Sequence, residues 1–304
     1  MRLALRTRRR LWIGLAAAFL VALVAAAIGV YVVRLSDPRN DRVIAGGACT
    51  GCDLAGIRLW WGDLHGVNLE GADLSGARLW WADLRGANLS HTNLTNASLW
   101  WATLDGIDLS GADLTGVRMG RAEISDGKLH RAVLKNADMV GVRLARADLS
   151  DAEMDWADLR QSVLPKADLR AARLPDTNFY LADMTGVRLD GADLTHASLV
   201  RADLSGAVLA GANFTKANLN DTVMKDADLT GVRLTDAQLV AADLSGAKLR
   251  GVDLTNANLW KTNFSGADLT DANLTGASLD DAVLDGARLC RTKLPSGQVD
   301  SGCP

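Results

Sequence analysis

The sequence predicts an all-β solenoid of short, four-sided coils that is preceded by one hydrophobic helix. A large apolar residue stands at every fifth position from Leu54 to Leu294, at all 49 positions of that register. The motif Leu-Trp-Trp begins at residues 59, 79 and 99, so it recurs after four such pentads. Residues 11–33 contain no charged side chain, which is the pattern of a helix in a lipid environment.

The composition agrees with repeats better than with two ordinary globular domains. Hydrophobic residues make up 48% of the 304-residue chain but aromatic residues only 5%, so the apolar material is mostly Ala and Leu. The net charge is -3, yet residues 1–42 carry +6 and the remainder carries -9. An acidic repeat region argues against binding to a nucleic-acid backbone, which requires clustered Lys and Arg.

The N-terminal segment has the features of a membrane anchor. Residues 1–10 form a basic tail with five Arg, and residues 11–33 follow as a predicted transmembrane helix. A helix of that length extends about 34 Å, and the hydrocarbon layer is about 30 Å thick. A cleaved signal peptide is the competing interpretation, because residues 25–27 are all Ala. The apolar run continues to Val33, and we therefore predict a retained anchor.

The arginines on either side of this segment predict its orientation. Five precede it and three follow it, so the positive-inside rule places the N-terminus in the cytoplasm and the repeats outside it. Residues 34–48 contain Asp37-Pro38 and Gly46-Gly47 without any periodicity, and we assign them to a linker.

The pentad period matches neither a helix nor a continuous strand. Two places before each large apolar residue stands Ala, Val, Ile, Thr, Ser, Gly or Cys. Alternate side chains of an extended segment point the same way, so both residues are predicted to point inward. The second place after the large residue is often Gly or Asn, as at Gly76 and Asn96, which suits a corner with positive φ. Pro165 and Pro175 stand one place earlier, where such a turn favours Pro.

The repeat of the Leu-Trp-Trp motif sets the size of one coil at 20 residues. We predict that residues 20 apart stack on each other and that backbone groups pair between coils. The repeat domain, residues 49–294, then has about twelve coils and a length of about 58 Å at a strand spacing of about 4.8 Å.

The tandem A(D/N)LXX pattern, as in residues 72–76 and 267–271, resembles the pentapeptide-repeat family. The resemblance covers roughly residues 52 to 294. It implies a right-handed quadrilateral parallel β-helix. Most members of that family have no assigned activity, and the exceptions are cytoplasmic DNA mimics that bind type II topoisomerases. The predicted membrane span distinguishes this chain from them.

Four cysteines flank the repeats: Cys49 and Cys52 before them, and Cys290 and Cys303 around their end. Most of the rod separates the two pairs, which excludes one shared metal site. We predict two disulfides that close the ends of the solenoid, Cys49 with Cys52 and Cys290 with Cys303, and a C-terminal cap over residues 295–304. The alternatives are a redox-active Cys-X-X-Cys at the first pair, or free thiols if the repeats are cytoplasmic.

No residue pattern indicates an enzyme. The four histidines lie in different stacking rows and form no metal cluster, and Ser and Asp recur only as repeat positions. A Gly-rich phosphate loop between a strand and a helix is absent from the sequence. We therefore predict no catalytic residue, no metal, no cofactor and no small-molecule substrate. The four histidines are His65, His91, His130 and His196.

One outward row of the predicted coil is unusually apolar, and it begins with three tryptophans. Three more tryptophans stand at the adjoining corner, and two arginines lie on the same face, where Arg over Trp forms a cation-π pair. The tryptophans have three interpretations: a structural ladder, a docking surface for a protein, or a contact with the membrane interface. The candidate binding residues are Arg58, Trp60, Trp61, Arg78, Trp80, Trp81, Trp100, Trp101, Tyr180 and Trp260.

A second departure from the repeat is the basic stretch from Arg118 to Arg146, with Gly127 at an inward Ala position. It suggests a local irregularity and a basic patch, or else a solvated surface. Taken together, the sequence predicts a non-enzymatic, single-span membrane scaffold whose Trp-rich face binds a protein. The alternative is a cytoplasmic DNA mimic that binds a type II topoisomerase.

Overall fold

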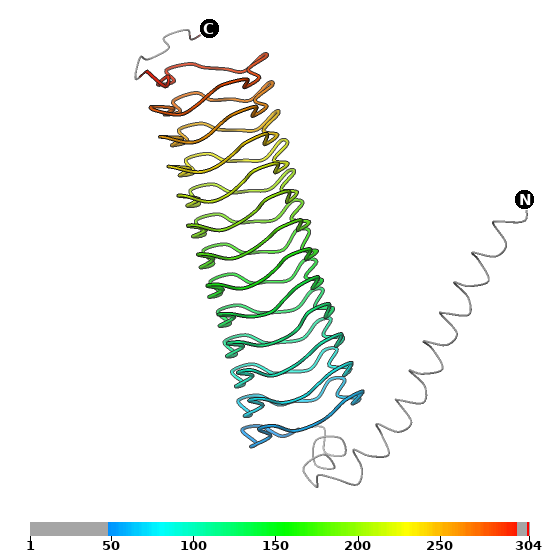
Figure 1. The fold of residues 1–304 in the computed structure, drawn as a ribbon. Helices are drawn as coiled ribbons and strands as arrows, with labels where there is room; N and C mark the ends of the chain where they lie inside the picture. Colours follow the sequence, from blue (N-terminus) through cyan, green and yellow to red (C-terminus); the bar gives the residue numbers. More distant parts are fainter. Residues whose placement is uncertain (1–47, 297–302, 304) are drawn as a thin grey trace, which may run out of the picture.

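The computed structural model describes residues 48–296 and 303, which form one long rod (Figure 1). Within these residues there is no helix and no extended strand; the β structure consists of single-residue parallel bridges. Each bridge joins a residue to the one 20 positions later, from the pair Ala48 and Asn68 to the pair Asn273 and Lys293. The predicted four-sided coil of 20 residues is therefore confirmed.

In the pentad 72–76 every backbone N–H has a partner. The N–H of Asp73 donates to the previous coil at 2.8 Å, and those of Leu74 and Gly76 donate to the next coil at 2.7 Å and 2.9 Å. The N–H of Ala72 donates at 3.0 Å to the carbonyl of the preceding inward leucine and closes the corner. Buried backbone donors are costly when unpaired, so this bonding fixes the register of neighbouring coils.

The fifth N–H explains why Asp or Asn precedes the leucine in so many pentads. The N–H of Ser75 donates at 2.9 Å to Oδ1 of Asp73, two residues earlier. Asn does the same at Asn213, whose Oδ1 accepts from the N–H of Thr215 at 3.2 Å. The sequence shows Asp here only as a recurring repeat position; the structure shows that it is the acceptor for the one N–H that points to neither coil.

The corner position, the second residue after an inward large residue, has positive φ from residue 56 to residue 291, and Gly51, the second residue after Cys49, has positive φ as well. The 49 values run from +53° at Arg291 to +70° at Gly276, as the corner pattern predicted. Twenty-nine of these residues are not glycine, including Trp61 and Trp81. An L-residue costs about 1–2 kcal/mol in this conformation, and hydrogen bonds to the two neighbouring coils must offset it.

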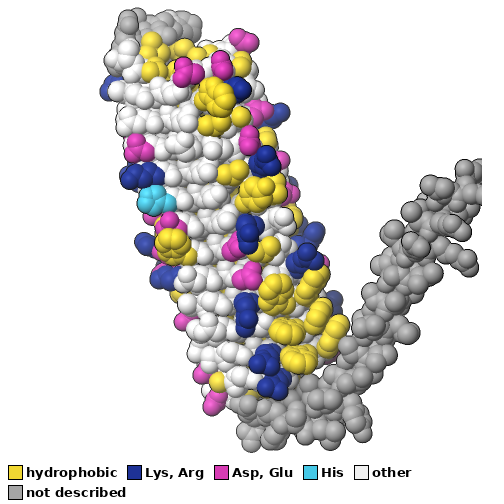
Figure 2. Space-filling view, viewed as in Figure 1, with side chains coloured by type: hydrophobic (Ala, Val, Ile, Leu, Met, Phe, Trp, Pro, Cys, Tyr) yellow, Lys and Arg dark blue, Asp and Glu magenta, His cyan; other side chains and the backbone are white. Residues whose placement is uncertain are grey.

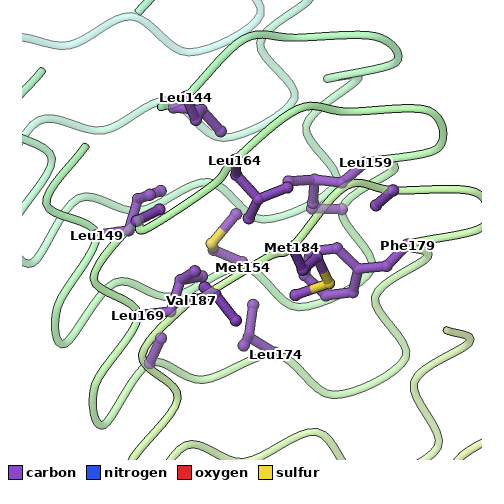
Figure 3. Packing of buried hydrophobic residues seen from close by; sticks show 14 of the residues in the cluster. Leu144, Leu149, Met154, Leu159, Leu164, Leu169, Leu174, Phe179, Met184 and Val187 are labelled. Atoms are coloured by element: carbon purple, nitrogen blue, oxygen red, sulfur yellow. The ribbon is translucent and has the colours of Figure 1, made fainter. Parts of the chain in front are cut away.

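The core is one continuous column inside the coils. The inward large residues at positions 54 to 274 are all at most 2% exposed, and the small residues beside them are buried as well, except for the partly buried Cys52 and Gly62. Figure 3 shows side chains from consecutive sides, such as Leu149, Met154 and Leu159, pointing into the same interior. Five buried threonines replace small apolar residues, and each donates its hydroxyl to a backbone carbonyl. They are Thr92, Thr177, Thr222, Thr262 and Thr292.

Both ends of the rod carry a disulfide. Cys49 bonds to Cys52 and Cys290 to Cys303, with Cα atoms 5.4 Å and 4.6 Å apart. Ala48, assigned to the linker from the sequence, pairs with the second coil and so belongs to the first. No helix that could cross a bilayer occurs among the described residues, and the predicted span over residues 11–33 lies outside them.

The Asp-based hydrogen bonds predict a loss of stability in acid. At Asp228 the hydroxyl of Thr230 donates to the carboxylate and lowers its pKa; partial burial opposes this, and the Thr230 N–H and Lys248 add to the lowering. A folded-state pKa below the unfolded value gives stability that is present above about pH 3.9 and lost as the pH falls through the folded pKa.

We expect Asp228→Asn to weaken this dependence, because Asn keeps the acceptor but does not titrate. Asn213 already makes the same pair of bonds to Thr215, at 3.2 Å and 2.7 Å. Urea midpoints measured from about pH 5 to about pH 2 should fall less steeply for the variant than for the wild type. Equal slopes would contradict the assigned role of this carboxylate.

Candidate functional site

The six tryptophans of the Leu-Trp-Trp motifs lie on one side of the rod near its N-terminal end, where Figure 2 shows hydrophobic side chains gathered beside Lys and Arg. Three follow an inward leucine directly and three occupy the next corner. The 20-residue bridges place each set in a row along the rod, one residue per coil. The positive φ of the corner tryptophans, 56° to 61°, turns their side chains outward.

The rings stack across coils in the first two coils of this side. Trp60 and Trp80 have ring centroids 5.5 Å apart with planes at 6°, and Trp61 and Trp81 are 4.8 Å apart at 5°. Trp80 also meets Trp81 edge to face at 6.4 Å. The stacked rings therefore cover one another's faces and turn their edges toward solvent. Trp81 and Trp101 remain 42% and 44% exposed.

The indole N–H groups of the first two coils are not equally satisfied. Nε1 of Trp80 donates to the hydroxyl of Ser98, 18 residues later. The position equivalent to Ser98 for Trp60 is Arg78, which has no acceptor, and Nε1 of Trp60 is buried without a partner. A buried unpaired donor costs about 1–3 kcal/mol, so an arginine at position 78 lowers the local stability of the rod.

Four exposed arginines surround the tryptophans, and none of them forms an ion pair within the described residues. Arg58 and Arg78 are bridge partners on adjacent coils, and Arg118 continues their row two coils beyond. Arg121 lies over the ring of Trp101 at 4.8 Å. The outward positions on this side carry no Asp or Glu from Arg58 to Arg121.

We call these ten residues the Trp–Arg face. It contains eight of the ten residues predicted from the sequence and adds two arginines. The face consists of Arg58, Trp60, Trp61, Arg78, Trp80, Trp81, Trp100, Trp101, Arg118 and Arg121.

The other two predicted residues lie on the same side but farther along. Tyr180 is four coils beyond Trp100, or about 19 Å at about 4.8 Å per coil, and Trp260 is four coils farther still. Trp260 is also occupied within the chain, because Lys261 lies 4.2 Å over its ring and Asp281 accepts from its Nε1 at 3.2 Å. The structure therefore does not bring these two residues into the Trp–Arg face.

Three sequence interpretations need correction or extension. The cation-π contacts in the described chain involve Arg121 and Lys261, where Arg58 and Arg78 had been expected. Arg118 and Arg121 were missed as site residues, although their 20-residue rows lead directly back to Arg58 and Trp61. Trp156, 63% exposed at another corner, was also missed, because it has no tryptophan neighbour in its row.

The basic stretch from Arg118 to Arg146 is not a patch. Its seven cations are distributed around all four sides of the coil, and three pair with acids, as Arg146 does with Asp126 at 2.6 Å. The backbone keeps its register at Gly127, so no irregularity occurs there. Gly is required because a Cβ at this position would lie 2.7 Å from Cγ2 of Ile124.

One Ser-His-Asp arrangement occurs on a flat outer side, and its geometry follows from the repeat. Nδ1 of His130 is 2.9 Å from Oγ of Ser150, but that hydroxyl donates to Asp148 at 2.5 Å. Thr and Ser make the same bond in many other pentads, for example Thr195 to Asp193. Nucleophilic catalysis requires the serine proton to point at the imidazole. Here it points at a carboxylate instead. Within residues 48–296 and 303, no three His, Cys, Asp or Glu side chains converge in a possible metal site.

Comparison with known proteins agrees with this architecture. A family model described as pentapeptide repeats matches the chain in 8 copies between residues 52 and 295. The chain belongs to the pentapeptide-repeat family. Its fold is accordingly the right-handed quadrilateral β-helix of that family. A search of curated proteins found no match.

Solved structures of other pentapeptide-repeat proteins resemble the chain. HetL, involved in heterocyst differentiation regulation in the cyanobacterium Nostoc, is 32% identical over 85% of this chain and 97% of its own, with a TM-score of 0.26. A protein from the Arabidopsis thaliana thylakoid lumen is 33% identical over 36% of this chain and 70% of its own, with a TM-score of 0.24. QnrB1, a plasmid-mediated fluoroquinolone resistance protein, is 23% identical over 68% and 92%, with a TM-score of 0.25. Membership in the family rests on the family model, which matches between residues 52 and 295.

The unpaired indole predicts that Arg78→Ser stabilises this pentapeptide-repeat rod. A serine hydroxyl would accept from Nε1 of Trp60, as Ser98 does for Trp80, and the charge beside Arg58 would disappear. We expect the free energy of unfolding to rise by about 1–2 kcal/mol, measured by urea denaturation at neutral pH. Arg233→Ser, at an exposed and unpaired arginine on another side, is the control and should change it by less than about 0.5 kcal/mol. No gain at Arg78 would contradict the assigned conflict.

Proposed function

We propose that this protein is a non-enzymatic, membrane-anchored scaffold whose Trp–Arg face binds a protein partner. The observation that supports binding is the face itself: six tryptophans and four uncompensated arginines, side by side on the first four coils. Trp and Arg are the side chains most enriched at energetically dominant positions of protein interfaces. Large contiguous aromatic surfaces of soluble proteins are seldom left without a function.

The rod supplies a rigid support for this face. Each pentad is held by backbone bonds to both neighbouring coils and by a continuous core, so outward side chains keep fixed spacings along the axis. Binding to a preorganised surface avoids the cost of ordering it. The proposal assigns this rod the role of displaying a surface.

Anchoring and location rest on the sequence of residues 1–33, with five Arg before an uncharged run of 23 residues. We infer one span, a cytoplasmic N-terminus and a repeat domain outside the cytoplasm. The disulfides Cys49–Cys52 and Cys290–Cys303 support that side of the membrane, because such bonds persist in oxidising compartments.

Topology is tested with reporters fused after Pro304 of the full chain. We expect alkaline phosphatase, which is active only outside the cytoplasm, to be active there, and a fluorescent protein that requires the cytoplasm to be dark. The reverse pattern would reject the proposed location and favour the topoisomerase-binding alternative.

Partner binding is tested by replacing Trp60, Trp80 and Trp100 together with Ser. The variant should retain the circular dichroism of the wild type, because these side chains lie outside the core. It should lose a partner that co-purifies with the full chain in detergent and is identified by mass spectrometry, by a factor of about 30 or more. Trp156→Ser, at an exposed tryptophan on another corner, is the matched control and should retain the partner. Undiminished recovery by the triple variant would reject the docking role.

A further inference from the structure

We propose that the partner of the Trp–Arg face is an acidic protein segment whose carboxylates pair with Arg58, Arg78, Arg118 and Arg121. This inference rests on the proposed function and specifies the chemistry of the partner. Four features of the described structure lead to it.

The first feature is an uncompensated pair of like charges. Arg58 and Arg78 are bridge partners on adjacent coils, and neither makes an ion pair within residues 48–296. Like charges directly opposite each other on neighbouring strands are destabilising. The other stacked pair of cations, Arg146 and Lys166, differs because Arg146 pairs with Asp126 at 2.6 Å. The missing countercharge at Arg58 and Arg78 is thus one that a bound molecule can provide.

The second feature is the contrast with the rest of the rod. Residues 43–304 carry a net charge of -9, while the Trp–Arg face carries four cations and no acid. Elsewhere several cations pair with an acid one coil away, as Lys128 does with Asp108 at 3.6 Å and Arg291 with Asp271 at 2.6 Å, whereas Arg118 forms no ion pair with Asp138, its bridge partner in the next coil. An acidic segment is repelled by most of the surface and attracted to this face. Such a field gives specificity and speeds association.

The third feature is the orientation of the rings. Trp60 stacks on Trp80 with planes at 6°, and Trp61 on Trp81 at 5°, so the faces between coils are already covered. A sugar or a nucleobase requires a free ring face for stacking. The edges turned outward carry the positive part of the ring quadrupole, which suits carboxylate oxygens. The ladder therefore fits acidic side chains better than stacking ligands.

The fourth feature favours a protein over a lipid surface. In the first two coils the indoles stack in pairs at centroid distances of 5.5 Å and 4.8 Å, in an array with the spacing of a β structure. These four indoles do not project singly, as an apolar side chain that inserts among acyl chains does. A fixed array of aromatic edges between arginine rows instead matches the regular side-chain spacing of a folded or extended polypeptide.

Arg78 shows that this charge is retained against local stability. Arg78 occupies the position from which a serine could accept a hydrogen bond from Nε1 of Trp60, and that Nε1 has no partner. At the equivalent position in the next coil, Ser98 accepts from Nε1 of Trp80. An arginine that disfavours its own coil is consistent with a residue needed for a partner. Arg78→Ser should therefore raise the urea midpoint and lower partner recovery in the same variant.

The carboxylates can be detected chemically with a lysine variant of the full chain. Arg58→Lys with Arg78→Lys keeps both charges and adds two primary amines. A zero-length carbodiimide activates a carboxylate, the lysine amine displaces the activating group to form an amide, and the reagent leaves as a urea that contains the lost oxygen. We expect amide adducts between these lysines and Asp or Glu of the co-purified partner, identified by peptide mass spectrometry. Arg233→Lys, on another side, is the matched control and should give none with the partner.

A second variant measures the contribution of charge. This Gln variant replaces all four arginines of the face, Arg58, Arg78, Arg118 and Arg121. We expect it to reduce partner recovery at least about tenfold in low salt and to remove most of the salt dependence of that recovery. The double lysine variant should keep both. Recovery by the Gln variant equal to wild type, or no partner adduct at the new lysines, would overturn the inference.

The remaining outcomes separate this inference from the proposed function. If the Trp→Ser variant loses the partner but the Gln variant does not, the acidic partner is rejected and the docking face stands. If no variant changes recovery, both are rejected. Full-length protein in nanodiscs of phosphatidylcholine, with and without phosphatidylglycerol, tests the lipid alternative. A blue shift of tryptophan emission that requires the anionic lipid and is absent in the Gln variant would assign the face to the membrane and overturn the inference.

Discussion

The structure depends on one constraint: each N–H of a coil that points along the rod must find a carbonyl exactly one coil away. In the pentad 72–76 three N–H groups meet this requirement through the neighbouring coils, one closes the corner, and one is taken by the Asp side chain, as it is in the many pentads that carry Asp or Asn at this position. A deletion or insertion of one residue would move every later donor away from its acceptor. This explains why the large apolar register from Leu54 to Leu294 never slips, and why even tryptophan is held at positive φ in a corner.

The same constraint leaves the choice of residue at outward positions of the coil almost unrestricted. Inward positions are restricted to Leu and its substitutes with a small neighbour, and corners are restricted by φ, but outward positions contribute little to the column. Residues 20 apart become neighbours whatever they are, so a short motif repeated at that interval becomes a surface. The Trp–Arg face arises in this way. It needs no loop and no pocket, and the rod's rigidity gives it fixed spacing.

Much of the fold and part of the candidate site could be predicted from the sequence, and the exceptions have identifiable causes. The period of the leucines and the interval of the Leu-Trp-Trp motif were sufficient for the four-sided coil, because side-chain volume and backbone pairing depend on the same register. The role of Asp73 could not be read, because it depends on the direction of the Ser75 N–H after the turn. The cluster from Arg118 to Arg146 was misread because residues close in sequence face four different sides. Proximity on this rod is measured in steps of 20 residues.

The residues at the site that depart from the repeat lower the stability of their own coils. Several cations elsewhere on the rod pair with an acid one coil away, as Arg291 does with Asp271, although acids such as Asp63 and Asp83 also stack on each other. In the first two coils, Arg78 places a second charge beside Arg58 and leaves the Trp60 indole without an acceptor. A sequence folds best when packing, hydrogen bonding and electrostatics all favour the same structure, and local conflicts among them are expected where function requires them. A solenoid can tolerate such a conflict because its stability is a sum over many coils. The cost therefore remains local, while the charge it leaves exposed is available to a second molecule.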